Sequence, residues 1–405
     1  MTNPPLTRDH TDLPDCPAPR EARCPLDPSP VYADWRRAEG LQRATWHGGP
    51  VWVVSRHEDI RAILGDDRFS ADYLRPGFPG MRLGGNEPPT FPRMDDPEHA
   101  RMRMMLTGDF TIKRVERMRP DIQKITDDFL EQMITKGQPA DLVHDYALPI
   151  PSLVMSLLLG VPYDDHKFFQ TNSLLMHERT ASDEERRAAH ATLFGYLLDL
   201  VARKEHEPGD DLLSRLINER VTTGELTREA VAMNGLILLI AGHETTANTI
   251  ALGSLALMQN PDQLARIRDT DDPAVLARAV EELLRYLSVV NDNVVRQATE
   301  DVTVGGQLIR AGEGVFLDLP SGNRDTAFLD RPDTLDLDRN TRGHVTFGYG
   351  VHQCLGQSLA RVELQIALPT LFRRLPGLRP AVPQEELTFR HDTAIYGLRE
   401  FPVAW

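Results

Sequence analysis

The chain has 405 residues, of which 41% are hydrophobic and 26% charged, and its formal net charge is −15 at pH 7. This is the composition of a globular protein, and the acidic balance disfavours nucleic acid as a partner, because the phosphate backbone attracts Lys and Arg. The longest apolar run, 236–241, is far shorter than the roughly 20 residues that a membrane span needs, so we expect a cytoplasmic protein without a membrane partner.

The N-terminal part is predicted to mix helix with a little sheet. Residues 1–30 are rich in Pro, Asp and Arg, lack the apolar core of a signal peptide, and are expected to form an irregular arm. A helix over 31–43, a strand over 50–55 and a helix over 56–64 follow. Residues 71–96 contain nine Gly or Pro, and we expect a long loop there that serves as a substrate-access lid.

The remainder is predicted to be mostly helical. Residues 98–220 are helical with breaks near Pro149, Pro151 and Pro162. One long helix over 226–259 is capped by Thr227, ends at Asn260-Pro261, and would be roughly 50 Å long. The later elements are a helix over 274–287, strands over 294–298, 302–304 and 314–319, an irregular segment over 330–343, and a last helix that ends near 375.

These elements predict a mainly α fold with a minor β part, in which a large helical region with a long central helix accompanies a small β-rich region. No linker is evident, so residues 1–405 are expected to form a single domain.

The three cysteines, Cys16, Cys24 and Cys354, are expected to be free thiols of a reducing compartment. Glycines at 348, 350 and 356 surround Cys354 and would let the backbone approach a bulky partner closely. A helix that starts just after Cys354 would point its free N–H groups at the sulfur, which we expect to lower the thiol pKa. A thiolate in such a loop is a strong ligand for haem iron.

The central helix contains a second unusual segment, Ala241-Gly242-His243-Glu244-Thr245-Thr246. Gly and Thr are poor helix-interior residues, and an acid followed by an alcohol can relay protons. His243-Glu244-x-x-Ala247 is close to the zinc-protease pattern His-Glu-x-x-His, but the second histidine that a metal pair needs is missing.

Both segments resemble motifs of one family. Phe347-x-x-Gly350-x-x-x-Cys354-x-Gly356 is similar to the haem-binding signature of the cytochrome P-450 family, and 241–246 is similar to its Ala/Gly-Gly-x-Asp/Glu-Thr-Thr motif. The resemblance extends from Cys24 over nearly the whole chain and is greatest to actinobacterial members. It implies the cytochrome P-450 fold and haem b with Cys354 as the iron ligand.

The resemblance also implies roles for other residues. Glu244 would be an acid that feeds the oxygen-side hydroxyl of Thr245, while Ala241 and Gly242 would leave room for dioxygen. Glu282 and Arg285 form a Glu-x-x-Arg pair that would be completed by Arg339. The residues expected to contact haem are His99, Arg103, Arg296 and His352 at the propionates, with Phe347, Gly348 and Gly356 in the cysteine loop.

The substrate is expected to be a medium-sized natural product or xenobiotic that is hydroxylated at a C–H bond. The candidate substrate residues are Ile237, Ile240, Asn291, Asp292 and Ile395. Asn291-Asp292-Asn293 departs from the small or apolar residues usual at this point in the family, and it indicates either a polar pocket or an exposed turn.

No flavin or iron–sulfur motif is present, so NAD(P)H-derived electrons are expected to arrive through a separate ferredoxin reductase and ferredoxin. Lys113, Arg114 and Arg361 are candidate contacts for the ferredoxin, and the protein is expected to be a monomer. Two alternatives stay open: a peroxygenase driven by hydrogen peroxide, and a non-enzymatic haem sensor or carrier.

Overall fold

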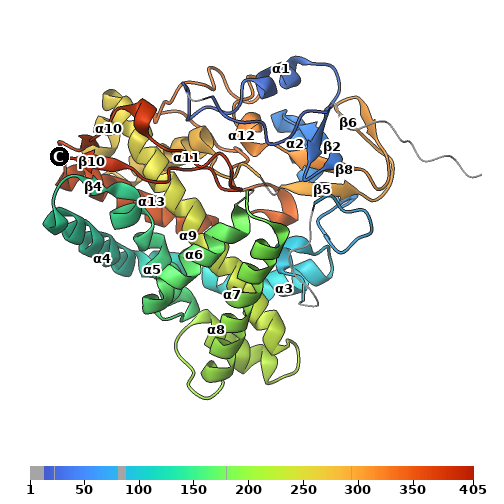
Figure 1. The fold of residues 1–405 in the computed structure, drawn as a ribbon, viewed down its shortest axis with the longest axis horizontal. Coiled ribbons are helices and arrows are strands. Elements are labelled where there is room, and N and C mark those ends of the chain that lie inside the picture. The colour runs from blue at the N-terminus through green and yellow to red at the C-terminus, as the bar shows by residue number, and fades with distance from the viewer. Residues whose placement is uncertain (1–12, 22, 81–87, 179, 293) are drawn as a thin grey trace, which may run out of the picture.

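A computed structural model describes residues 13–405 except 22, 81–87, 179 and 293. A large helical body lies beside a smaller part built on a twisted sheet, as Figure 1 shows with β2, β5 and β8 grouped at one side. The main hydrophobic core lies among the helices, and two smaller apolar clusters lie on the faces of the sheet. The prediction of a mainly helical fold with a minor sheet is confirmed.

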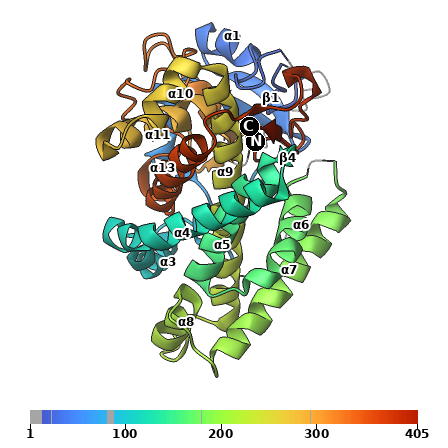
Figure 2. The same ribbon diagram turned by 90° about the vertical axis from the view of Figure 1, so that its left-hand side faces the viewer.

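The central helix, α9 (Arg228–Gln259), runs through the middle of the helical body (Figures 1 and 2). The Thr227 hydroxyl accepts a hydrogen bond from the Ala230 N–H, and the helix ends before Pro261, so the predicted limits are confirmed. It packs against α5 (Pro149–Leu159), α7 (Asp183–Lys204) and α13 (Gln357–Arg374). At 1.5 Å per residue α9 is about 48 Å long.

The other helices surround this bundle. They are α3 (Glu98–Thr107), α4 (Ile112–Lys136), α6 (His166–His177), α8 (Leu212–Leu216), α10 (Pro261–Arg268) and α11 (Pro273–Leu287), with α1 (Val31–Arg37), α2 (His57–Leu64) and α12 (Leu319–Gly322) on the sheet side. Wide, π-helical turns over Val143–Ala147 and Ile217–Val221 precede α5 and follow α8.

The main sheet has the order β1-β2-β8-β5-β3. Its strands are β1 (Gln42–Trp46), β2 (Gly49–Val54), β3 (Phe69–Ser70), β5 (Val295–Ala298) and β8 (Gly314–Leu317). Only β2 and β8 pair in parallel. His47 and Gly48, both at positive φ, form the two-residue turn between β1 and β2, a geometry that matches strand twist. A second, three-stranded sheet has the order β4-β10-β9, formed by β4 (Ala140–Asp141), β10 (Pro402–Ala404) and β9 (Arg379–Pro380). A two-stranded sheet is formed by β6 (Val302–Val304) and β7 (Gln307–Ile309).

The structure corrects the element predictions at several points. The helix predicted over 31–43 ends at Arg37, because Gly40 at φ +68° turns the chain into β1. The expected access loop contains one helical turn, η1 (Phe91–Arg93), and its residues 81–87 lie outside the described part. Within the arm, residues 13–21 and 23–30 have irregular backbone, yet Cys16 is buried and Arg20 is 5% exposed, so this stretch is firmly packed.

Candidate functional site

The loop before α13 holds Cys354 in a fixed turn. The Cys354 N–H donates to the Phe347 carbonyl at 2.8 Å, and Gly348 and Gly350 have φ near +70°. A Cβ on Gly350 would lie 2.4 Å from the Leu64 carbonyl oxygen, so α2 leaves no room for a side chain there. Gly356 has φ −80°, and a Cβ on it would meet no described protein atom within 4 Å. The fold itself therefore requires glycine at 350 but not at 356.

Cys354 is a free cysteine whose surface is partly exposed, although protein atoms crowd its sulfur. Desolvation by these atoms raises the pKa of its thiol, and this outweighs the lowering by the Gly356 and Gln357 N–H groups and by the charges of Arg103 and Arg361. The N–H groups at the start of α13 therefore lower the thiol pKa as expected, but the net change is upward. The surrounding protein removes more water from the thiolate than the helix N-terminus replaces.

Cationic and imidazole groups gather beside the cysteine loop. His99 and Arg103 come from α3, and His352 comes from the short turn η6 (Gly350–His352). The His99 and His352 rings lie 4.1 Å apart, and Arg103 donates to the Gln353 carbonyl at 2.6 Å. Arg296 of β5 completes the set that the sequence indicated. The structure thus brings all four predicted propionate residues into one neighbourhood.

Asp96 lies 3.0 Å from His99 Nδ1, but the pKa values of Arg296 and His352 are still lowered in this group. Burial lowers the pKa of Arg296 to about 10, helped by the charge of Arg93. Burial and the charges of Arg296, His99, Arg103 and Arg93 lower the pKa of His352 to about 3. His99 Nε2 and His352 Nδ1 are buried and have no hydrogen-bond partner among the described residues. Two orphaned imidazole nitrogens next to arginines fit an anion that binds there.

Sequence reasoning missed Arg93, which belongs to η1 at the end of the predicted access loop. The charge of Arg93 lowers the pKa values of both Arg296 and His352. Burial lowers the pKa of Arg93 itself, and the charge of Asp292 partly offsets this. Its position in a loop rich in Gly and Pro gave no signal of this, because the contact depends on how the loop folds back onto β5.

Helix α9 presents one accessible stripe. Between Ala230 and Leu257 every residue is buried except Ile237, Ala241, Gly242 and Thr245. Ile237, Ala241 and Thr245 are four apart and share one face of the helix. Gly242 has a different environment, because a Cβ there would lie 2.4 Å from the Met155 sulfur of α5. Ile240 is 5% exposed and belongs to the main core, so the expected substrate contact is not seen there.

The acid and the alcohol of α9 have different partners. The Glu244 carboxylate is 4% exposed, accepts a hydrogen bond of 2.8 Å from Ser173 of α6, and lies 3.9 Å from His243 Nε2. The Thr245 hydroxyl donates to the Ala241 carbonyl at 2.7 Å. The two side chains therefore have separate partners here, and the predicted delivery of protons from Glu244 to Thr245 stays a prediction.

Glu282 and Arg285 of α11 form a buried ion pair. Both are 0% exposed, and Arg285 Nε and Nη2 donate to the two carboxylate oxygens at 2.7 and 2.8 Å. Arg339 Nη1 lies 3.9 Å from Glu282, and the Asp336 N–H donates to the same carboxylate at 3.0 Å. The structure brings the three predicted members together.

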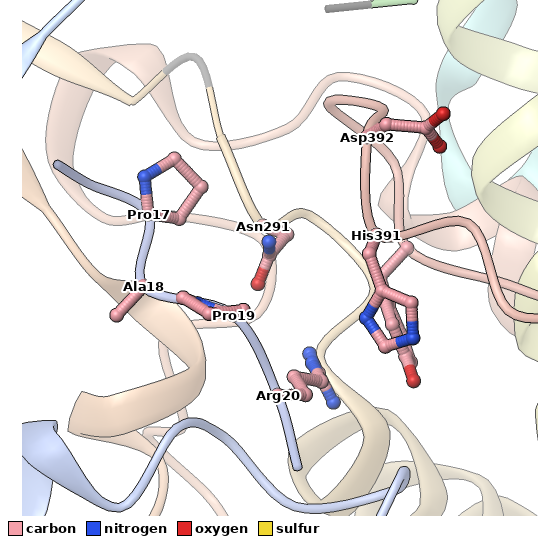
Figure 3. Close-up of a pocket in the computed structure, with 8 residues that line it drawn as sticks. Pro17, Ala18, Pro19, Arg20, Asn291, His391 and Asp392 are labelled. Atoms are coloured by element: carbon pink, nitrogen blue, oxygen red, sulfur yellow. The ribbon is translucent and has the colours of Figure 1, made fainter. Parts of the chain in front are cut away.

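The polar residues expected near the substrate have other surroundings. Asp292 is 3% exposed and accepts a hydrogen bond of 2.6 Å from the Trp46 indole N–H, so it contributes to packing against β1. Asn291 faces a small cavity beside the N-terminal arm (Figure 3). Asn293 lies outside the described residues. Ile395, which pairs with Val290, stays partly accessible.

Comparisons with known proteins agree on one family. The cytochrome P450 family model matches residues 41–382. Cytochrome P450-SU2 of Streptomyces griseolus is 53% identical over 98% of this chain and 100% of its own, and pentalenic acid synthase of Streptomyces avermitilis is 46% identical over 96% of each. A crystal structure of the mycinamicin VIII C21 methyl hydroxylase MycCI from Micromonospora griseorubida, bound to mycinamicin VIII, superposes with a TM-score of 0.90 at 38% identity, over 97% of this chain and 100% of that one.

No helix among the described residues is long and apolar enough to cross a membrane. The residues that the family model matches include the cysteine loop, the cationic group beside it and the accessible stripe of α9. The match over most of the chain, together with the relatives and the solved structure, establishes that this protein belongs to the cytochrome P450 family and is a haem-thiolate monooxygenase.

Proposed function

We propose that this enzyme hydroxylates a medium-sized natural product or xenobiotic at haem b bound between Cys354 and the accessible stripe of α9. The observation that carries this proposal is the stripe itself: Ile237, Ala241 and Thr245 stay accessible on a helix whose other central residues, apart from Gly242, are buried. An exposed alanine in the middle of a core helix is unusual unless something else covers it.

The residues present fit haem. Cys354 supplies a sulfur ligand, and a bound metal deprotonates a coordinating thiol even where burial has raised its pKa. His99, Arg103, Arg296 and His352 would hold the two propionates, with the orphaned His352 Nδ1 as a donor, while His99 Nδ1 is turned toward Asp96 Oδ1 at 3.0 Å. Gly356 leaves space that no described protein atom fills. Phe347 and Gly348 would complete the contact on the cysteine side.

When bound, haem with a thiolate ligand activates dioxygen. The protein residues place the substrate and move protons. Ala241 has the smallest side chain of the stripe and would leave room next to the cofactor. The Thr245 hydroxyl, now bonded to the Ala241 carbonyl, would turn to donate a proton on this face. Glu244 would resupply that proton after its carboxylate leaves Ser173, through water or a side-chain rotation.

The substrate class follows from the lining and from the relatives. Ile237 and Ile395 offer apolar contact at the site, and two relatives carry the names pentalenic acid synthase and mycinamicin VIII hydroxylase. Asp292 is a poor substrate contact, because it is buried and its Oδ1 accepts the hydrogen bond of the Trp46 indole N–H. The pocket would thus select mainly by shape and apolar area.

Electrons would come from NAD(P)H through a ferredoxin reductase and a ferredoxin. The hydrogen bond from Arg103 to the Gln353 carbonyl connects α3 to the cysteine loop. Met104, the next residue of α3, is 73% exposed, and Val351 of the loop is 56% exposed. Ile112, the sequence neighbour of Lys113, is 72% exposed as well, and exposed apolar residues with a nearby positive charge suit a partner with an acidic rim around an apolar centre. Arg361 is a weaker candidate contact than expected, because it is bound to both carboxylate oxygens of Glu281.

The peroxygenase alternative differs in its source of oxygen, and the sensor alternative has no turnover at all. The acid and alcohol of α9 favour the monooxygenase, because hydrogen peroxide already carries the protons that they would deliver. Turnover with peroxide, and none with NAD(P)H plus a ferredoxin system, would favour the peroxygenase.

Thr245→Ala tests the proposed proton delivery, with Thr245→Ser as the matched control that keeps the hydroxyl. A compound library is first screened by the spectral shift that substrates cause, and the best ligand is then used for turnover. We expect Thr245→Ala to retain haem and ligand affinity but to divert most reducing equivalents to hydrogen peroxide, while Thr245→Ser stays close to the parent enzyme. Equal coupling of product to NAD(P)H in all three proteins would contradict the role of Thr245.

A further inference from the structure

A cavity with mixed polar and apolar lining lies outside the proposed haem site. It has a volume of about 160 Å³ and is lined by residues 17–20 of the N-terminal arm and by Asn291, His391, Asp392 and Tyr396. We call it the arm cavity. Figure 3 shows Arg20, Asn291 and His391 around one space, with Pro17 and Pro19 on the side of the arm.

Arg20 brings a buried positive charge to this cavity without a direct counter-ion. The residue is 5% exposed, and its guanidinium makes only two long hydrogen bonds of 3.3 Å, to the carbonyls of Leu26 and Ser288. Its Cζ lies 4.0 Å from the centre of the Tyr396 ring. Within the described part of the chain no carboxylate lies within ion-pair distance of Arg20, and its Nε has no hydrogen-bond partner.

The carboxylate nearest to the cavity does not neutralise Arg20. Asp392 receives two hydrogen bonds from Arg399, at 2.7 and 2.8 Å, and its side chain points away from Arg20 in Figure 3. Burial, and then the charge of Arg20, lower the pKa of His391. The charges of Asp318 and Asp27 act on Arg20 without forming an ion pair with it, so the cavity combines a guanidinium that has no directly bound carboxylate with polar groups and the apolar rings of the prolines.

The wall of the arm cavity is also a wall of the proposed substrate site. Val290 and Ile395 pair as an antiparallel bridge, flanked by hydrogen bonds from the Asn291 N–H to Ala394 O at 3.0 Å and from the Tyr396 N–H to Val289 O at 2.8 Å. Successive side chains in extended chains point to opposite faces. Asn291 and Tyr396 thus share the face toward the arm cavity, and Ile395 lies on the other face.

We propose that the arm cavity binds a small organic carboxylate, of about the size of benzoate, with its carboxylate on Arg20 and its apolar part against Pro17 and Pro19. A cavity of about 150 Å³ is known to hold one benzene ring, and a guanidinium is the side chain best shaped for a carboxylate. Because the ligand would rest on one face of the Val290–Ile395 bridge, its binding would stiffen the chain that presents Ile395. The site does not depend on the oxidation chemistry.

The test uses the haem-loaded protein and 4-fluorobenzoate, with binding followed by fluorine NMR and by calorimetry. Acetate tests the charge without the ring, and fluorobenzene tests the ring without the charge. Arg20→Gln removes the guanidinium charge, Ala18→Phe fills the cavity but keeps Arg20, and Arg23→Gln is the matched control because Arg23 is an exposed arginine of the same arm. Hydrogen exchange of the Asn291 and Tyr396 amides reports on the bridge.

We expect saturable binding of 4-fluorobenzoate in the parent protein and in Arg23→Gln, with slower exchange of both amides. Arg20→Gln should weaken binding about 10-fold or more, as expected for the loss of a charge-assisted pair, and Ala18→Phe should abolish it. Absence of saturable binding to the parent protein would overturn the proposal. So would undiminished binding in both Arg20→Gln and Ala18→Phe, which would place the ligand elsewhere, such as the haem pocket.

Discussion

Replacement of Arg285 by Met tests how much the buried Glu282–Arg285 ion pair of α11 contributes to the stability of the fold. Arg285 donates to both oxygens of Glu282 and, at 2.9 and 2.8 Å, to the carbonyls of Asn323 and Pro332. Methionine is of similar length, so the change removes these hydrogen bonds without leaving a large cavity. The Glu282 carboxylate would stay fully buried, with the Asp336 N–H as its closest remaining partner.

A buried charge that loses its partner costs about 3–5 kcal/mol. With a urea dependence of unfolding near 3 kcal/mol per M, such a loss lowers the urea midpoint by about 1 M or more. The measurement is urea unfolding of the ferric protein, followed by tryptophan fluorescence. Arg37→Met is the control, because the Arg37–Asp34 pair is exposed, and we expect its midpoint to stay unchanged.

The double variant Glu282→Leu/Arg285→Met separates lost charge pairing from lost packing. Because it also removes the buried carboxylate, which in Arg285→Met keeps only the Asp336 N–H and the more distant Arg339, it should recover a large part of the stability that Arg285→Met loses. A midpoint for Arg285→Met within 0.3 M of the parent protein, or a double variant that is less stable than the single one, would refute this reasoning.

Two further predictions concern the cysteine loop and pH. Gly350→Ala places a Cβ 2.4 Å from the Leu64 carbonyl oxygen at a residue with φ +71°, so we expect a much lower haem content per protein, measured by absorbance. The control is Gly108→Ala, whose Cβ lies in open space and which should bind haem fully. Equal haem content in the two variants would contradict the requirement for glycine at 350. The Asp141 carboxylate raises the pKa of the half-exposed His144, so the pair stabilises the fold below about pH 6.5 and this contribution is lost as pH rises through the higher folded-state pKa. His144→Gln should therefore lower the urea midpoint slightly near pH 6 and not near pH 9, and a larger effect at high pH would contradict the assignment.

Features fixed by local sequence were predicted well. The limits of α9 follow from Thr227 and from Asn260-Pro261, whose capping and helix-ending effects act within one turn. The spacing of Glu282 and Arg285 places them on one helix face, so their pairing needs no knowledge of the rest of the fold.

Features that depend on distant partners were not predicted. Asp292 is bound to Trp46, a residue 246 positions away, and only the assembled sheet brings the two together. Gly242 is small because Met155 of α5 packs there. The thiol pKa of Cys354 was predicted in the wrong direction, because burial depends on the whole fold, whereas the favourable helix N-terminus can be recognised locally.

The most direct test of this account is the carbon monoxide difference spectrum of the reduced protein, compared between the parent protein and Cys354→Ser. Because a thiolate ligand alone shifts the main haem band to the long wavelength that defines this class, we predict that band for the parent protein and its loss in Cys354→Ser. A parent protein that stays colourless after expression with ample haem precursor, or one whose spectrum is that of imidazole-ligated iron, would contradict the assignment of Cys354 as the iron ligand.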